Sequence, residues 1–204
     1  MKVAISKEPF SEYSPSMAKK RSEIQRHPDR GAPARAAEFL AAGRVAHLAF
    51  LEGEQPIAIP FAYHFDPAWP ERLYLHGSPA SRALRLAASG APLCVTVTLV
   101  DGFVYSKSAM YHSMNYRSVV CFGRGSLVTD RSTQQTVYEG MVRRHFPGRT
   151  PGKDYAPATD AQLDATLLVE VAIEECSAKM REGGPAGPLD ADPAAPGTCG
   201  VLPL

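Results

Sequence analysis

Apolar residues along the middle of the chain recur at the spacing of β-strands. The clearest case is residues 56–65, in which every second position from Ile57 to Phe65 is large and apolar. Pro60 lies inside this segment and cannot donate a ladder hydrogen bond, which favours an edge strand or a backbone left free for another contact. The pattern predicts seven strands, at residues 44–51, 56–65, 72–76, 92–99, 102–108, 117–128 and 166–174.

Helical patterns are fewer and shorter. Residues 33–42 and 79–89 each begin with Pro and stop at a Gly, which is the usual asymmetry of helix ends. Residues 131–146 follow Asp130, a suitable N-cap, and Thr159 to Gln162 forms a capping box. The longest helix places one group of side chains on a single side: Val137, Met141, Val142 and His145. Strands with short inserted helices predict a small, mainly β barrel, because closing a sheet removes its exposed edges.

Two details concern strand geometry. Gly123 and Gly125 lie inside a strand pattern, which favours a β-bulge or a close backbone approach. Glu174 and Glu175 are adjacent, so on a regular strand their side chains face opposite ways. The carboxylates therefore form no obvious catalytic pair.

The two ends of the chain differ from its middle. Residues 1–30 contain few large apolar side chains and are expected to form a basic arm outside the core. Residues 31–182 form the predicted domain, and residues 183–204 a C-terminal segment that packs on the barrel. Half of residues 183–198 are Gly or Pro, which excludes a helix or central strand there.

Composition narrows the class of protein. The 204 residues are 45% hydrophobic and carry a net charge of +1, which does not support a dedicated nucleic-acid binder. No apolar stretch is long enough for a membrane span, and the first residues do not resemble a signal peptide, so we expect a cytoplasmic protein. The four cysteines are widely separated, which predicts buried free thiols and no metal site.

Two segments could carry chemistry. The turn from Leu75 to Arg82 brings Ser78, Ser81 and Arg82 to a helix start, where free N–H groups, hydroxyls and a guanidinium suit a phosphate. The alternative is that Ser78 only caps the helix and Arg82 is a surface charge. Residues 105–118 are polar and aromatic, and could stack on a planar ring. In that segment Lys107 and Arg117 could balance an anion, unless it is simply a solvated hairpin.

These motifs, in this order, resemble the FMN-binding split-barrel family related to pyridoxamine 5′-phosphate oxidase, and in particular its nitroimidazole-resistance branch. The resemblance covers roughly residues 25–204. The matching pieces are Pro56–Pro60, Leu73–Arg82, Asp101–Ser108, His112–Gly123, Pro147–Arg149 and Ser177–Arg181.

The resemblance implies a six-stranded split β-barrel that forms a homodimer with FMN at the subunit interface. Ser81 and Arg82 would hold the FMN phosphate, with Ser78 nearby. His76 would lie at the reactive side of the flavin, for substrate contact or proton transfer, unless it is a strand-end His bonded to backbone. The other cofactor-binding residues so implied are Ile59, Pro60, Tyr63 and Gly77 around the ring, with Lys107, Asn115, Tyr116 and Arg117 from the hairpin.

The function so implied is an FMN-dependent oxidoreductase acting on a small, planar substrate. The alternatives are a flavin- or haem-binding module without turnover, and a deazaflavin protein. The chain departs from its relatives at Thr198-Cys199, where they carry an aromatic residue, and at Lys107, where they carry Arg. Lys keeps the positive charge but lacks the planar guanidinium of Arg. The substrate and the flavin affinity of the relatives therefore cannot be assigned to this chain directly.

Overall fold

The computed structural model describes residues 20–204, so the first 19 residues of the predicted arm lie outside it. The strands are β1 (Val45–Glu52), β2 (Gln55–His64), β3 (Arg72–Gly77), β4 (Pro92–Tyr105), β5 (Ser113–Leu127), β6 (Leu167–Arg181) and β7 (Gly200–Pro203). The helices are α1 (Ala36–Ala42), α2 (Arg82–Ala88), α3 (Arg131–His145) and α4 (Asp160–Asp164), with 3-10 turns η1 (Pro28–Arg30), η2 (Pro33–Arg35) and η3 (Ala109–Tyr111). Across residues 20–204, no helix combines the length and hydrophobicity that crossing a membrane requires.

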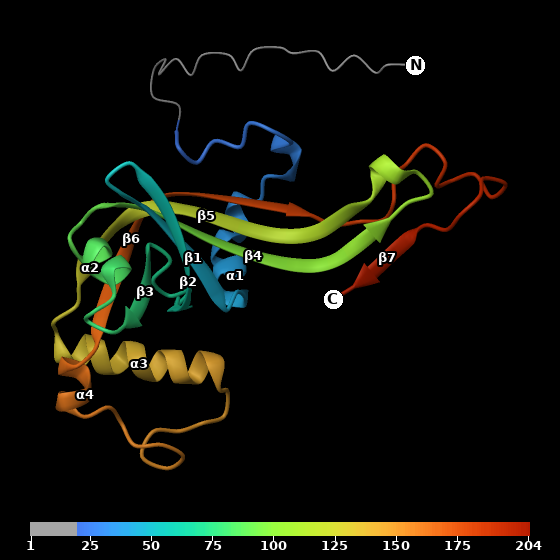
Figure 1. Ribbon diagram of the computed structural model, residues 1–204. Coiled ribbons are helices and arrows are strands. Elements are labelled where there is room, and N and C mark those ends of the chain that lie inside the picture. Colours follow the sequence, from blue (N-terminus) through green and yellow to red (C-terminus); the bar gives the residue numbers. More distant parts are fainter. Residues whose placement is uncertain (1–19) are drawn as a thin grey trace.

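Six antiparallel strands close into a barrel (Figure 1). Their order is β1-β2-β3-β6-β5-β4, and residues 47–49 of β1 return to residues 94–96 of β4 to complete the circle. β2 pairs with β3 only at Tyr63 and His64, so the rest of β2 is bonded on one side only. Pro60 lies in that one-sided part, as its missing N–H predicts. The predicted six-stranded barrel is confirmed.

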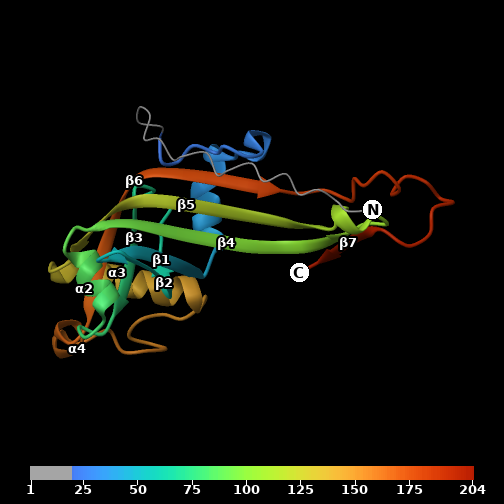
Figure 2. The ribbon, with the colours of Figure 1, turned by 45° about the horizontal axis from the view of Figure 1, so that its top comes forward.

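β4 and β5 are longer than the barrel, and their outer halves form an arm that projects from it (Figures 1 and 2). The two strands predicted at 92–99 and 102–108 are in fact one strand, β4, because a register shift between Val100 and Gly102 bends the strand without ending it. β7 pairs with the outer half of β4, so the C-terminal segment is not entirely loop.

Asp190 attaches the C-terminal segment to the end of this arm. Its carboxylate accepts hydrogen bonds from Ser106 Oγ (2.9 Å), Lys107 N (2.8 Å) and Gly187 N (2.6 Å). Lys107 Nζ donates to the carbonyl oxygen of Asp192 at 2.7 Å. The segment 183–204 therefore contacts the β4–β5 hairpin.

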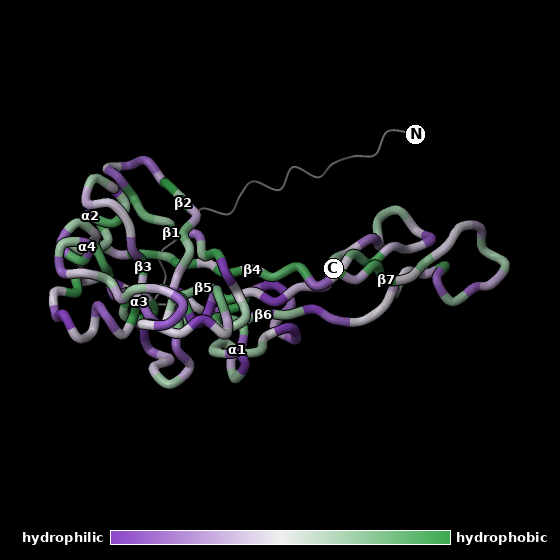
Figure 3. The backbone as a smooth tube through the Cα atoms, turned by 90° about the horizontal axis from the view of Figure 1, so that it is seen from below, coloured by the Kyte–Doolittle hydropathy of each residue, from purple (hydrophilic) through white to green (hydrophobic). Residues whose placement is uncertain are grey.

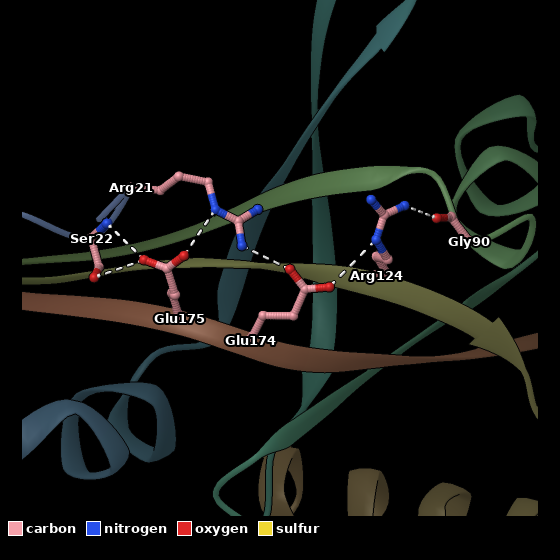
Figure 4. A network of polar contacts seen from close by, with 6 residues as sticks. All are labelled: Arg21, Ser22, Gly90, Arg124, Glu174 and Glu175. Carbon is pink, nitrogen blue, oxygen red and sulfur yellow. Dashed lines mark hydrogen bonds and ion pairs between the residues drawn. The ribbon is translucent and has the colours of Figure 1, made fainter. Parts of the chain in front are cut away.

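Glu174 and Glu175 do not face opposite ways, contrary to the expectation for a regular strand. The register between β5 and β6 shifts at Gly123, and this bulge brings both carboxylates to Arg21, at 2.7 and 3.1 Å (Figure 4). The predicted close approach at Gly123 is confirmed, since a Cβ there would lie 1.9 Å from the carbonyl oxygen of Ala172. Arg21 thereby holds the described end of the N-terminal arm against β6.

Two hydrophobic cores result. The barrel interior is filled by aliphatic side chains and closed by Phe39 of α1, which is fully buried. A second, smaller core forms where α3 packs on the outer face of β3 and β6, from Tyr74, Val137, Met141 and Leu168. The predicted N-cap of α3, Asp130, and the capping box of α4 are both confirmed. All four cysteines are free, but only Cys121 is buried, because the other three lie on outward-facing positions.

Arg144, near the end of α3, ties that helix to the barrel. Its guanidinium donates to the carbonyl oxygens of Leu40 (2.7 Å), Gly43 and Tyr63 (3.0 Å), at the end of α1 and in β2. It also lies 4.3 Å from the centre of the Tyr63 ring, which is a cation–π contact. One side chain thus satisfies carbonyl groups left unpaired at a helix end and positions α3.

Arg144→Ala should lower the free energy of unfolding by about 2–4 kcal/mol, because it removes charge-assisted hydrogen bonds and leaves several carbonyl groups unpaired. The neighbouring Arg143 is the matched control, since its side chain is 61% exposed and its ion pair with Glu139 is 4.0 Å long. Arg143→Ala should change stability by less than about 0.5 kcal/mol. Urea unfolding measures both, and equal effects would contradict the role assigned to Arg144.

Candidate functional site

A cavity of about 540 Å³ lies between α3 and the barrel. Its floor is formed by β2 and β3, at Ala62, Tyr63 and His76. α3 forms one wall, and the chain after α3, from Phe146 to Ala158, forms the other. In Figure 1 this helix and the following loop lie below the barrel, at the end away from the arm.

The cavity contains three buried polar atoms without a hydrogen-bond partner among residues 20–204. They are Nδ1 of His76 on β3, Oη of Tyr138 on α3 and Oη of Tyr155 on the loop. Buried polar groups are normally paired, and an unpaired one costs roughly 1–3 kcal/mol. Three such groups in one apolar cavity indicate a site that is completed by a bound molecule.

The cavity is weakly charged. Among the described residues that line it, none is Lys or Arg, and the one carboxylate is Glu139. Burial lowers the pKa of His76, and the nearby His145 lowers it further, so its imidazole is neutral at pH 7. Burial raises the pKa of Tyr138, which keeps the phenol protonated. The site therefore offers neutral hydrogen-bonding groups and a neutral imidazole.

His64, at the end of β2, lies beneath α3 beside the cavity floor. It is 9% exposed, and Gly140 makes room for it, since a Cβ at position 140 would be 2.6 Å from its ring. Burial, and then the positive charge of Arg144, lower the pKa of His64 to about 4. The packing of α3 over His64 therefore favours the neutral form of its imidazole.

The turn before α2 holds the predicted phosphate-binding residues. Ser81, rather than Ser78, is the N-cap of α2, and its Oγ accepts from Leu84 N at 3.4 Å. Ser78 Oγ accepts from Ala80 N at 3.1 Å. Arg82 is exposed and pairs with Glu52 at 2.8 Å. Such a surface pair is worth roughly 1 kcal/mol or less, so Arg82 is available to an anion.

The predicted ring-lining residues occupy different environments. Ile59 is half-buried against the barrel core, and Pro60 is exposed. Tyr63 is fully buried, and its hydroxyl donates to the carbonyl oxygen of Leu40. Gly77, at the end of β3, lets α2 approach, since a Cβ there would be 3.0 Å from Leu84. Only Tyr63 and His76 of the predicted residues line the cavity.

The remaining predicted residues belong to β5 and to the turn between β4 and β5, whose outer parts form the arm that points away from α2 and β3 (Figures 1 and 2). Arg117 is bonded to Asp101, and Asn115 accepts from Arg181. Lys107 is held by Asp192, and Tyr116 lies opposite Arg181 in the β5–β6 register. Within one chain the arm residues therefore do not meet the α2 turn, and only a second chain could bring them together.

The arm exposes many large apolar side chains. β4 stays hydrophobic as it leaves the barrel (Figure 3). Met110 at the tip is 91% exposed and Leu202 on β7 is 58% exposed. The other exposed apolar residues of the arm are Val100, Phe103, Tyr105, Tyr111, Val201 and Leu204. A patch of this kind is typical of a surface that another protein chain covers.

Sequence reasoning missed most of the cavity. Tyr138 and Tyr155 carried no motif, Pro147–Arg149 in the loop wall was matched to the family without a role, and α3 was identified only as an amphipathic helix. One signal was present, since His145 falls on the apolar side of that helix and does line the cavity.

Comparison with protein families gives one match. A family model described as pyridoxamine 5′-phosphate oxidase matches residues 33–180. A search of curated proteins found no match.

Solved structures resemble the whole chain. A flavocytochrome, Anf3 from Azotobacter vinelandii, is 27% identical with a TM-score of 0.78, covering 91% of this chain and 85% of its own. A FAD and haem binding protein from Mycobacterium smegmatis is 32% identical, with a TM-score of 0.76. The match covers 86% of this chain and 84% of that protein. A protein described as a 5-nitroimidazole antibiotic resistance protein from Bacteroides thetaiotaomicron shares the fold, with 17% identity and a TM-score of 0.59. The match covers 73% of this chain and 84% of that protein.

Stability should fall on acidification because of His64. Its folded-state pKa of about 4 lies below the ordinary value of 6.5, so the unfolded chain binds the extra proton as the pH falls between these values. Between pH 7 and 4.5 this costs on the order of 2 kcal/mol. In urea unfolding, the free energy of unfolding of His64→Gln should fall less between pH 7 and 4.5 than that of the wild type, because the His64 contribution is gone. His47→Gln, at an exposed position of β1, is the control, and an identical pH profile in wild type and His64→Gln would contradict the prediction.

Proposed function

The chain belongs to the pyridoxamine 5′-phosphate oxidase family, and from this premise we propose that it is a flavin-dependent oxidoreductase that also binds haem in the cavity beneath α3. The observation that carries the haem assignment is His76, a half-buried imidazole in the floor of an apolar cavity. Two relatives that cover most of this chain, a flavocytochrome and a FAD and haem binding protein, support it.

The residues present fit such a group. Histidine is a common ligand of haem iron, and the site needs only one or two protein ligands. Met141, Val142 and Phe146 supply apolar walls, and the volume lies within the range of small-molecule sites. His76 would bind the iron, and His145 provides a second imidazole in the same cavity.

Flavin supplies two-electron chemistry and haem one-electron chemistry when they are bound. The chain's own contribution is position and environment. The cavity walls exclude water and lower the local dielectric, which strengthens every polar contact made inside. The neutral state of His76 keeps a lone pair available to a metal.

For the flavin, the α2 turn is the proposed phosphate site. The hydroxyls of Ser78 and Ser81 remain free to donate, and Arg82 is held only by a surface ion pair. FMN remains our prediction from the sequence, while FAD is the flavin named for one relative. The substrate we propose is small and planar. The four free cysteines are consistent with the cytoplasmic location that completes the proposal.

A homodimer is part of the same proposal. The exposed apolar residues of the arm support it, because they form a surface suited to a second copy of the chain. In a dimer the arm of one chain would bring Lys107, Asn115, Tyr116 and Arg117 to the flavin of its partner. The two groups of predicted residues, separated in one chain, would then act at one site.

His76→Ala should weaken haem binding by at least about 10-fold, because it removes the proposed iron ligand. Titration of the apoprotein with haem, followed through the intense absorbance band near 400 nm, measures the affinity and the coordination. His112→Ala, at an exposed position of the hairpin, should bind as wild type does. Unchanged spectra in His76→Ala, or a loss seen only in His145→Ala, would contradict the assignment of His76.

Arg82→Ala should weaken flavin binding by about 1–3 kcal/mol, or roughly 5- to 150-fold in Kd, through loss of a charge-assisted contact with phosphate. Separate titrations with FMN and FAD measure this and identify the preferred flavin. Arg85→Ala is the control, since Arg85 is exposed on the same helix and donates only to the carbonyl oxygen of Pro79 at 3.3 Å. Equal affinities of Arg82→Ala and wild type for both flavins would refute the phosphate site.

A further inference from the structure

Tyr138 and His76 face each other across the cavity. The ring centres are 5.5 Å apart and the planes are nearly perpendicular, at 87°. Tyr138 belongs to α3 and His76 to β3, so the contact joins the wall of the cavity to its floor. An edge-to-face pair of this kind contributes to packing, and it does so without any need for the phenol hydroxyl.

The hydroxyl therefore needs a separate explanation. Tyr138 Oη and His76 Nδ1 are both buried, and neither has a hydrogen-bond partner among the described residues. A phenol can donate and accept, and a neutral imidazole carries one N–H and one lone pair. The two unpaired groups are chemically complementary and lie on adjacent rings. A phenylalanine would give the same ring contact without the cost of a buried hydroxyl.

We infer that Tyr138 is a positioning residue for His76: after a small side-chain rotation, which the structure requires because the two atoms are not bonded in it, the hydroxyl accepts a hydrogen bond from Nδ1–H and so directs Nε2 into the cavity. The inference rests on the proposed function, because Nε2 is the nitrogen that would bind the haem iron. Histidines that bind metals usually donate their other ring N–H to a nearby acceptor, which fixes the tautomer and makes the ligating nitrogen more basic.

Other acceptors for His76 Nδ1 also line the cavity. Gln162 already accepts from Thr159 N, and Gln135 donates its amide to the carbonyl oxygen of Ala158. His145, Tyr155 and Glu139 are the remaining candidates. Tyr155 Oη is also unpaired, but it belongs to the loop wall and makes no ring contact with His76. Glu139 follows Tyr138 on α3 and has an ion pair with Arg143 at 4.0 Å. Tyr138 is the residue already placed against the imidazole, which leads us to assign the role to it.

The experiment compares Tyr138→Phe, which removes only the hydroxyl, with Tyr155→Phe as the matched control. In the haem-loaded protein, Tyr138→Phe should release ferric haem at least about 10-fold more readily than wild type, the usual effect of losing a partner of a metal ligand. Ferrous haem should be affected less, so the midpoint potential should become more positive. Tyr155→Phe, which removes a hydroxyl from the loop wall of the same cavity, should increase haem release less than Tyr138→Phe does and leave the midpoint potential unchanged. Tyr138→Leu should additionally lower stability by removing the ring.

A second measurement does not depend on haem. Nitrogen-15 NMR of the apoprotein, labelled at histidine, reports which ring nitrogen of His76 carries the proton. Wild type and Tyr155→Phe should show the Nδ1–H form, and Tyr138→Phe should shift towards Nε2–H. An unchanged tautomer in Tyr138→Phe, or the same change in Tyr155→Phe, overturns the inference. Failure of the wild-type protein to bind haem would instead refute the proposed function, while the NMR result would still decide the role of Tyr138.

Discussion

The position of α3 depends on Arg144, and the candidate site depends on α3. The guanidinium donates to carbonyl groups at the end of α1 and in β2 and lies over the Tyr63 ring, so a single charge joins three elements. The next residue, His145, lines the cavity. Any movement that separated Arg144 from these carbonyls would leave polar groups unpaired and would open the cavity at the same time.

The packing of the barrel explains why the chemistry lies outside it. The interior is occupied by fully buried aliphatic side chains and Phe39, which leaves no room for a ligand. A cavity can form only where another element covers the outer face of the sheet, as α3 does over β2 and β3. The same cover buries His64 and lowers its pKa, so the contact favours the neutral imidazole. The site and its pH sensitivity thus arise from one packing arrangement.

The fold was largely predictable from the sequence, because strand alternation and helix caps are local signals. Asp130 and Thr159 identified the helix starts. Bulges limited the same reasoning. Gly123 indicated the irregularity opposite Glu174, but not that both neighbouring carboxylates would reach one arginine, and the shift at Gly102 made one strand resemble two. His76 was identified by resemblance, whereas Tyr138 and Tyr155 were not, because their burial depends on how α3 and its loop pack on the sheet.

The last strand has a consequence for how the chain avoids uncontrolled pairing of strand edges. β4 is covered by β1 along the barrel and by β7 along the arm, and Asp190 holds the segment that delivers β7. A chain ending at residue 182 would leave the outer edge of β4, from Gly102 to Tyr105, unprotected. Open strand edges recruit strands from other molecules, so the final 22 residues act as a built-in guard against fibre-like assembly.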